Sequence, residues 1–248
     1  TDAVITIVTN DGDATDTDTI AVTVAAINDP PTLTATSSDD THTEDAGAVS
    51  LYTGTAVTSG GTGGTAETDE IDLLTMTITN VQDTAEQIAF DGSTITISSA
   101  GQGTTVGDGL IPWVVTLDGT TATLAFDGNG AISWTAAELA ADLTAATYTN
   151  TDQSPTTSAT RVITITHLAD EGSGSSPHDN SADSGLAQTT TITIAAAQDL
   201  PTTGDQTKTI LEDATYTAAS GDFTFADVDG DSITKIKITT LESVGVLE

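Results

Sequence analysis

The sequence contains no cysteine and only four lysine and arginine residues among its 248 residues. Without cysteine there are no disulfides, no thiol nucleophile and no thiolate metal ligand, so the fold must be stabilised by other means. Binding to nucleic acid or to an anionic membrane surface requires clustered basic residues, so their scarcity argues against both partners. No apolar run is long enough to span a bilayer.

The chain also lacks an initiating methionine and a signal peptide at Thr1. We therefore expect it to be a segment of a longer protein whose targeting signal lies elsewhere. Negative charge is abundant, with 37 Asp and Glu residues and a formal net charge of −33. Self-repulsion of this size opposes a compact state unless counterions neutralise it, and divalent cations are the obvious candidates.

Two stretches repeat within the chain. Ile20–Pro31 matches Thr190–Pro201 at a displacement of 170 residues, and Val4–Ile7 matches Val162–Ile165 upstream. Each copy consists of a strand pattern, an acidic loop, a second strand pattern, and then an acidic residue and proline. Repetition at a fixed spacing predicts a tandem array, and the proline predicts a stiff linker between units. The predicted units are the end of one repeat (1–29), a complete central repeat (30–199) and the start of another (200–248).

Apolar residues alternate with threonine or lysine along much of the chain, which is typical of half-buried antiparallel strands. Turn dipeptides such as Asp91-Gly92, Asp108-Gly109 and Asp118-Gly119 separate these runs, as does Asp127–Gly130. The sequence therefore predicts an all-β fold of antiparallel β-sandwich domains. The alternating pairs are Ile5/Ile7, Leu74/Met76/Ile78, Ile95/Ile97, Leu124/Phe126, Ile163/Ile165, Ile192/Ile194, Phe223/Phe225 and Ile236/Ile238.

One short helix is predicted in the central unit, over Thr135–Leu143. Thr135 and Glu138 have the spacing of a capping box at a helix N-terminus. Leu139 and Leu143 are four residues apart and would share the face that packs against the sheet.

Several short motifs resemble the cadherin-like (Ig-like) tandem repeats that form the stalks of giant RTX-type adhesins secreted by Gram-negative bacteria. The motifs are Asn28–Pro31, Thr43–Asp45, Leu211–Asp213 and Phe225–Asp231, and in the centre Tyr148–Thr151, Pro155-Thr156 and Arg161–Thr166. The resemblance implies seven-stranded Ig-like sandwiches, Ca²⁺ at the domain boundaries, type I secretion, and a spacer or adhesive role at the cell surface. Its implied partners are neighbouring repeats and identical chains in a fibre or biofilm.

The clearest candidate ligands for calcium lie near the C-terminal end. Asp227, Asp229 and Asp231 place three carboxylates at alternate positions, and Gly230 allows the backbone to bend around an ion. The twelfth position of this loop is isoleucine, so it is not an EF-hand. The alternative is that these are solvated turn residues. Three further acids could complete the site, namely Glu212, Asp213 and, in the linker, Asp199.

A second, weaker site is predicted at the start of the central unit. Matching residues 73–81 to 233–241 places Glu67 and Asp69 where Asp227 and Asp229 lie, but isoleucine replaces the third aspartate. Asp72 would have to substitute for it, and solvated acids are an equally good interpretation. The partners expected for this site are Asn28, Asp29, Glu44 and Asp45.

No catalytic pattern stands out, and we expect no enzymatic activity. The three histidines (His42, His167 and His178) have no metal-pair spacing, and no G-x-S-x-G motif occurs. Trp113 and Trp134 could line a sugar site but are expected in the core. The acids Asp170, Glu171, Asp179 and Asp183 are expected in a long solvated loop, and the alternative is that this loop is a binding surface.

Two functions from different classes remain at this point. The first is a structural spacer outside the cell, made rigid by calcium at the junctions between repeats. The alternative is that the central unit is a lectin-like or self-associating binding module that mediates adhesion. Acids gathered at junctions favour the spacer, whereas a lectin would gather acids and aromatic residues on one loop cluster. A glycan ligand is possible, but no motif supports one.

Overall fold

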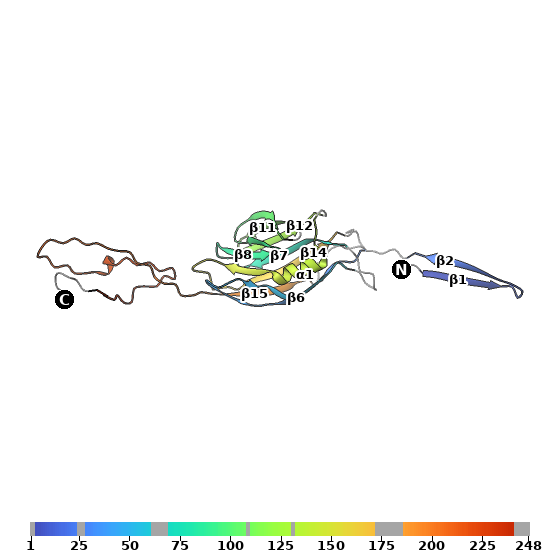
Figure 1. The fold of residues 1–248 in the computed structure, drawn as a ribbon, viewed down its shortest axis with the longest axis horizontal. Coiled ribbons are helices and arrows are strands. Elements are labelled where there is room, and N and C mark those ends of the chain that lie inside the picture. The colour runs from blue at the N-terminus through green and yellow to red at the C-terminus, as the bar shows by residue number, and fades with distance from the viewer. Residues whose placement is uncertain are drawn as a thin grey trace.

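The computed structural model describes residues 3–23, 28–60, 69–107, 110–129, 132–171 and 186–240. Three parts follow one another along the long axis of the molecule (Figure 1). A β-hairpin lies at one end, a central body holds most of the strands and the helix, and the segment 200–240 extends at the other end.

The largest sheet of the central body has seven strands in the order β10-β11-β12-β7-β14-β15-β4. Neighbouring strands are antiparallel except for β15 and β4, which are parallel through Thr193–Ala195 and Thr41–Thr43. The strands are β4 (Thr41–Thr43), β7 (Ile71–Thr79), β10 (Gly101–Thr104), β11 (Pro112–Asp118), β12 (Thr121–Asp127), β14 (Arg161–Asp170) and β15 (Gln188–Ala195).

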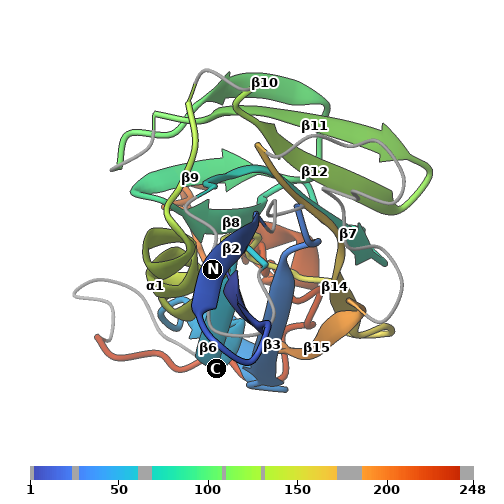
Figure 2. The same ribbon diagram turned by 90° about the vertical axis from the view of Figure 1, so that its right-hand side faces the viewer.

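Two smaller sheets and one helix complete the body. A four-stranded sheet has the order β5-β13-β8-β9, and a two-stranded sheet pairs β3 with β6. Helix α1 (Ala136–Ala145) lies beside β6 and β8, as the view along the long axis shows (Figure 2). The strands are β3 (Thr32–Ser37), β5 (Val49–Ser50), β6 (Tyr52–Thr58), β8 (Glu86–Phe90), β9 (Ser93–Thr96) and β13 (Thr147–Asn150).

The apolar face of each strand in the body forms the core, as the period-two patterns predict. Every second residue of β7 is buried from Leu74 to Ile78, and β12 and the first half of β14 contribute the same alternation. Burying each such side chain is worth about 1.5–3 kcal/mol, so these strands hold the sheets together. The predicted core residues that are buried are Leu74, Met76, Ile78, Ile95, Ile97, Leu124, Phe126, Ile163, Ile165, Ile192 and Ile194.

The predicted helix and its capping box are confirmed. The backbone N–H of Glu138 donates to the Thr135 hydroxyl at 3.2 Å, and the Glu138 carboxylate accepts from the backbone N–H of Thr135 at 2.8 Å. These bonds satisfy donors that a helix N-terminus otherwise leaves without partners. Leu139 and Leu143 are buried, and the helix runs two residues beyond its predicted end.

The turn dipeptides join hairpins where the structure describes them. Asp91 and Gly92 both have positive φ, 42° and 69°, and connect β8 to β9. Positive φ at both central residues is the geometry of a two-residue type I′ turn. Gly119, with φ of 60°, connects β11 to β12. Asp108-Gly109 and Gly130 lie outside the described residues.

A buried ion-pair network fixes one end of β14. Arg161 is fully buried, and its guanidinium contacts the carboxylates of Asp83 at 2.6 Å and Glu86 at 2.8 Å. It also donates to the carbonyls of Thr156 and Ala159, at 2.8 and 2.9 Å. Burial by itself would lower the pKa of Arg161, but the hydrogen bond and charge of Glu86 raise it, so the arginine is charged.

Two further residues of the central motif converge on the same acids. The Tyr148 hydroxyl donates to Glu86 at 2.9 Å, and the Asn150 amide donates to Asp83 at 2.7 Å. Burial and the charge of Glu86 raise the pKa of Tyr148. The motif Tyr148–Thr151 therefore serves to hold buried charges in a hydrogen-bonded network that stabilises the body.

The hairpin at the N-terminal end has the same strand register as β14 and β15. Strand β1 (Ala3–Asn10) pairs with β2 (Thr15–Val22), and Ile5 lies opposite Ile20. Under the repeat alignment these two residues correspond to Ile163 and Thr190, which also lie opposite each other. The internal repeat is therefore a repeat of structure as well as of sequence.

Three sequence-based expectations are wrong in detail. The alternating pairs Phe223/Phe225 and Ile236/Ile238 do not form strands; within the described segment 200–240 only the bridge between Thr202 and Ala226 is paired. No described strand lies beside them, and a strand needs a partner for its backbone.

The β15–β4 pair is parallel, and the described central body has thirteen strands, β3 to β15, where the resemblance implied seven. The all-β class with one α-helix in the described residues is confirmed.

Candidate metal centre at the linker after the central body

The linker that follows β15 lies against the turn that follows β4. Because β4 and β15 are parallel, their C-terminal ends lie at the same edge of the sheet. The backbone N–H of Glu44, just after β4, donates to the carbonyl of Ala195 at 2.8 Å. The backbone N–H of Ala197 in turn donates to the Glu44 carboxylate at 2.9 Å. These bonds hold Glu44 beside the linker.

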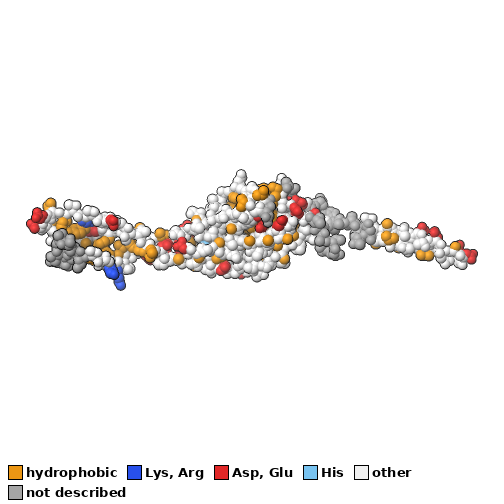
Figure 3. All heavy atoms as spheres, in the orientation of Figure 1, with side chains coloured by type: hydrophobic (Ala, Val, Ile, Leu, Met, Phe, Trp, Pro, Cys, Tyr) orange, Lys and Arg blue, Asp and Glu red, His pale blue; other side chains and the backbone are white. Residues whose placement is uncertain are grey.

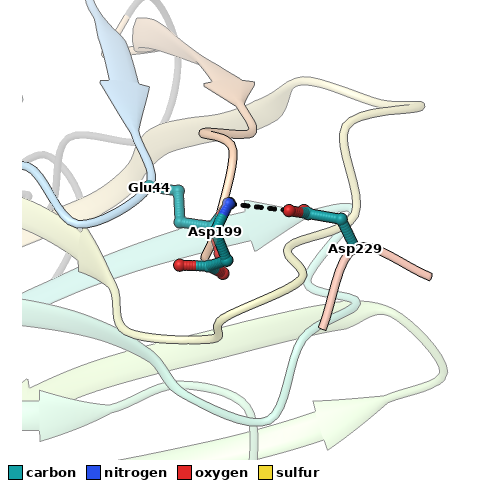
Figure 4. A group of neighbouring side chains, drawn as sticks. All are labelled: Glu44, Asp199 and Asp229. Atoms are coloured by element: carbon teal, nitrogen blue, oxygen red, sulfur yellow. Dashed lines mark hydrogen bonds between the residues drawn. The ribbon is translucent and has the colours of Figure 1, made fainter. Parts of the chain in front are cut away.

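Three carboxylates from distant parts of the sequence meet here. Glu44, Asp199 and Asp229 each place one carboxylate oxygen so that the three oxygens lie within 4.8 Å of one another. Figure 4 shows the side chains around the backbone N–H of Asp199, which donates to Asp229 at 2.8 Å. They belong to the β4 turn, the linker and the segment 200–240, so a ligand bound to all three would connect these parts.

Two oxygens of this group are buried without a hydrogen-bond partner. One is Oε1 of Glu44, whose residue is 3% exposed, and the other is Oδ2 of Asp199. A buried carboxylate oxygen without a partner carries a desolvation cost that a cation would offset. This is the observation that distinguishes the group from ordinary solvated acids.

The loop 227–231 has the folded shape that its sequence predicts. Asp227 accepts from the backbone N–H of Asp231 at 3.1 Å, and Gly230 has a φ of 78°. The side-chain amide of Gln198 donates to Asp229 at 2.9 Å and to Asp231 at 2.8 Å. The loop is thereby fixed to the linker through its second and third aspartates.

Several negative charges act on Asp199. Burial raises the pKa of Asp199 above its ordinary value of 3.8, and the negative charges of Asp229, Asp45 and Asp227 raise it further. The candidate ligand atoms are all carboxylate oxygens, which favour hard cations such as Ca²⁺ and Mg²⁺ over zinc or copper. The group therefore fits the class of cation that the sequence predicts, with further ligands from water or nearby acids.

The structure groups the predicted ligands differently from the sequence. Glu44 and Asp45 were expected at the first junction, which precedes the central body near Asp29. Glu44 instead lies at the second junction, which follows the body at Asp199. Glu212 and Asp213 were expected beside Asp229, but they are not in the group. The parallel pairing of β4 with β15 is the cause, because it carries the turn after β4 toward the end of its own unit.

The two turns are structurally equivalent. Asp45 and Asp213 have left-handed φ values of 60° and 63°. In each turn the following alanine N–H donates to the carbonyl three residues before it, at 3.0 and 3.1 Å. Glu212 therefore has the same position in its turn as Glu44 has in the first, although Glu44 is buried and Glu212 is exposed.

The first junction brings together a different set. The amide of Asn28 donates to Asp170 at 3.2 Å, and Asp170, the last residue of β14, is fully buried. Asp72 lies in β7 and Asp29 in the linker, with Asp69 just before β7. Among the described residues, no three acids meet here as they do at the second junction. Glu67 lies outside the described residues.

Asp170 was missed as a functional candidate because its sequence context looked like the start of a solvated loop. It is the last residue of β14 and pairs with Ile71, the first residue of β7, and both strands are interior to the seven-stranded sheet. Alternation along β14 could not have indicated its burial, because Arg161, Ile163 and Ile165 face the core and a register shift between Ile165 and His167 then brings Leu168 and Asp170 to the buried side. The predicted loop residues His178, Asp179 and Asp183 lie outside the described residues.

The two tryptophans occupy different environments. Trp134 is fully buried against Phe90 and Phe126, with ring centroids 6.1 and 6.0 Å away, as predicted. Trp113 is only partly buried and covers Gly103, where an added Cβ would lie 2.5 Å from the indole ring. The burial of Trp134 removes it from any sugar site.

No protein-family model matches the sequence, and neither a curated protein nor a solved structure shows a significant match. The chain is therefore classified by its fold and candidate site alone, as an all-β protein with a carboxylate cluster at a linker. Within the described ranges, no helix is long and apolar enough to cross a membrane.

Proposed function

We propose that this chain is a structural spacer in a long protein outside the cell, in which calcium at the linkers fixes successive repeats relative to one another. The observation that carries the proposal is the meeting of Glu44, Asp199 and Asp229 from three parts of the chain. An ion bound by all three restrains the linker, because its ligands come from both sides of it.

Three further features support this role. The units follow one another along the long axis (Figure 1). The linker contains a proline at position 201, and proline restricts the backbone on both sides. The net charge of −33 favours association with cations. Extracellular calcium is millimolar, which is sufficient for the weak sites typical of extracellular modules, with dissociation constants on the order of 10⁻⁴ M.

Within this proposal the chain is part of a cadherin-like or Ig-like tandem array in a secreted adhesin of the RTX type. Its first partners are the neighbouring repeats of the same protein. The proposal includes no catalytic activity, because the candidate group has no nucleophile and no feature of an active site other than its acids.

Small-angle scattering on the full chain tests the proposal directly. In millimolar calcium we expect a larger radius of gyration and the profile of a single elongated shape. In chelator the restraint at the linker is lost, and the two sides become free to swing. Identical profiles under the two conditions would mean that packing and proline stiffness alone hold the linker.

Two matched variants sharpen the scattering experiment. Glu44→Gln should abolish the calcium response, because it neutralises one ligand of the group. Glu212→Gln changes the equivalent residue of the following unit and should leave the response intact. A response lost with Glu212→Gln and retained with Glu44→Gln would support the grouping expected from the sequence instead.

Calcium affinity should depend on pH through Asp199. Its pKa is raised by burial and by neighbouring acids, so protons compete with the cation at a higher pH than for an ordinary aspartate. In chelator the stability of the ordered linker has the opposite dependence on pH. Because the ordered state binds the proton of Asp199 more tightly, it is stabilised fully below the pKa of Asp199 in the disordered linker. This stabilisation is lost as the pH rises through the raised pKa of Asp199 in the ordered linker.

Calorimetric titration of calcium from neutral pH down to about pH 4 would measure this competition. We expect affinity to fall as the pH is lowered toward the raised pKa of Asp199. Asp199→Asn should bind more weakly at neutral pH and show a smaller change with pH, whereas Asp213→Asn should behave like the unaltered chain. An equal pH dependence in all three proteins would contradict the assignment of Asp199.

A further inference from the structure

The strands by which the chain enters and leaves the central body are paired with each other. The chain enters through β3 and β4 and leaves at the end of β15. Thr41 lies opposite Thr193 and Thr43 opposite Ala195, and the two strands are parallel. A pull on both sides of the body therefore acts on two strands in direct contact.

The parallel orientation decides how this pair responds to tension. Tension along the chain pulls β4 from its N-terminal side, through β3, and pulls β15 from its C-terminal side, through the linker. Because the strands are parallel, these pulls slide one strand along the other, and the bonds that run across the pair are loaded together. In an antiparallel pair the same pulls would act at one shared edge and break the bonds one after another.

Backbone bonds extend this pair beyond the residues of β4. On the N-terminal side, the N–H of Thr193 donates to the carbonyl of Asp40 at 3.0 Å. On the C-terminal side, the N–H of Glu44 donates to the carbonyl of Ala195 at 2.8 Å. Sliding β4 against β15 must break the bonds on both sides.

Asp39 adds a side-chain anchor in the turn between β3 and β4. Its carboxylate accepts from the backbone N–H and from the hydroxyl of Thr191, each at 2.9 Å. Hydrogen bonds from Ser37 and Thr191 lower the pKa of Asp39 below its ordinary value of 3.8, so these bonds are charge-assisted and stronger than neutral ones. We call the contacts of residues 39–44 with residues 190–195 the terminal clamp.

The inner side of the terminal clamp is shielded from water. His42 is 1% exposed, and Ile194, which lies opposite it, is 3% exposed. A backbone group that loses its partner on this side finds no water to replace it, and a buried group without a partner is costly. This cost raises the barrier to separating the two strands.

The arrangement of the molecule directs tension into the terminal clamp. The hairpin β1–β2 and the segment 200–240 lie on opposite sides of the central body along the long axis (Figure 1). The molecule narrows from the body toward the segment 200–240 (Figure 3). A pull between the two ends therefore reaches the body through β3 on one side and β15 on the other.

We propose that the terminal clamp bears mechanical load: under tension along the chain, the central body stays folded until the parallel contact between β4 and β15 is sheared. The use of this property in the intact protein rests on the proposed spacer function, since a spacer between two anchored ends carries tension. The terminal clamp itself requires no bound ion. Its failure and the failure of the calcium site are therefore separate results.

Single-molecule stretching of the full chain in chelator tests the direction of loading. The chain has no cysteine, so handles can be attached at chosen positions. Handles at the two termini load the terminal clamp in shear, whereas handles at Gly47→Cys and the C-terminus load it from the edge where β4 and β15 both end. A Cβ added at Gly47 meets no atom within 4 Å. Because shear must break the bonds on both sides of β4 together, we expect about a twofold higher unfolding force with terminal handles.

Two matched glycine variants separate the terminal clamp from overall stability. Asp39→Gly removes the anchor, and glycine accepts the left-handed φ of 46° at this position. It should lower the unfolding force between terminal handles, and Asp39→Asn, which keeps an acceptor oxygen and tolerates this φ, should retain most of the force. Asn80→Gly is the control, since Asn80 has a φ of 62° and donates to the carbonyl of Thr160 at 2.8 Å, away from β3, β4 and β15. It should leave the force unchanged.

Equal unfolding forces for the two handle positions would overturn the proposal. So would an equal fall in force for Asp39→Gly and Asn80→Gly, because the force would then follow overall stability. Both experiments are made in chelator, so neither depends on the response of the linker to calcium.

Discussion

Replacing Arg161 by methionine is expected to lower the free energy of unfolding by about 3–5 kcal/mol, because it leaves two buried carboxylates without their cation. For a chain of this size the melting temperature should fall by about 6–20 °C. Glu86 is fully buried and Asp83 nearly so, and neither can reach water without disrupting the body. Denaturant unfolding and calorimetry of the full chain would measure the loss.

Two comparisons distinguish the loss of the buried ion-pair network from the loss of any one positive charge. The double variant Arg161→Met with Glu86→Gln should recover part of the loss, because one of the orphaned charges is gone. Lys208→Met removes a basic residue whose ion pair with Asp222, at 2.6 Å, is partly exposed, so it should change stability less than the loss of the buried arginine. Equal losses for Arg161→Met and Lys208→Met would contradict a special role for the network.

Calcium is expected to raise the melting temperature of the unaltered chain, and Glu44→Gln should remove most of that rise. At 100-fold excess over the dissociation constant, binding to the folded state alone contributes about 2.7 kcal/mol. This corresponds to about 5–10 °C for a chain of this length. In the unaltered chain the N–H of Ala197 donates to Glu44 at 2.9 Å. Glutamine retains a side-chain oxygen that can accept this bond, so the variant removes the negative charge and keeps the side chain in position.

Chelator provides the internal control for this experiment. Without calcium, Glu44→Gln should melt at or slightly above the temperature of the unaltered chain, because one member of a repelling group has been neutralised. Glu212→Gln should respond to calcium like the unaltered chain. A melting temperature that is the same in calcium and in chelator for all three proteins would remove the basis for the metal centre.

Much of the secondary structure could be predicted because it depends on local chemistry. Alternation along β7 and β14 predicted strands, since burial on one face has a period of two. The capping box at Thr135 and the turn at Asp91-Gly92 were equally accessible, because their bonds and dihedral angles involve residues close in sequence. The same alternation failed at Ile236 and Ile238, where strand formation requires a partner that the described chain does not place beside them.

The buried ion-pair network was not predictable in this way. Asp83 and Glu86 precede Arg161 by more than 70 residues, and their proximity results from the pairing of strands. The sequence did mark Tyr148, Asn150 and Arg161 as parts of a motif. It could not show that they bind the same two acids, because periodicity describes the face of a strand and not the neighbour that it meets.

Local patterns in the sequence are sufficient to predict the all-β class, the internal repeat, the acidic character and the choice of aspartates and glutamates as candidate ligands. The tertiary structure decided which of these acids meet. Glu44 reaches Asp199 and Asp229 because β4 runs parallel to β15 and both end at the same edge. Strand direction depends on contacts between residues more than 150 positions apart, and that information is absent from any local pattern of charge or hydrophobicity.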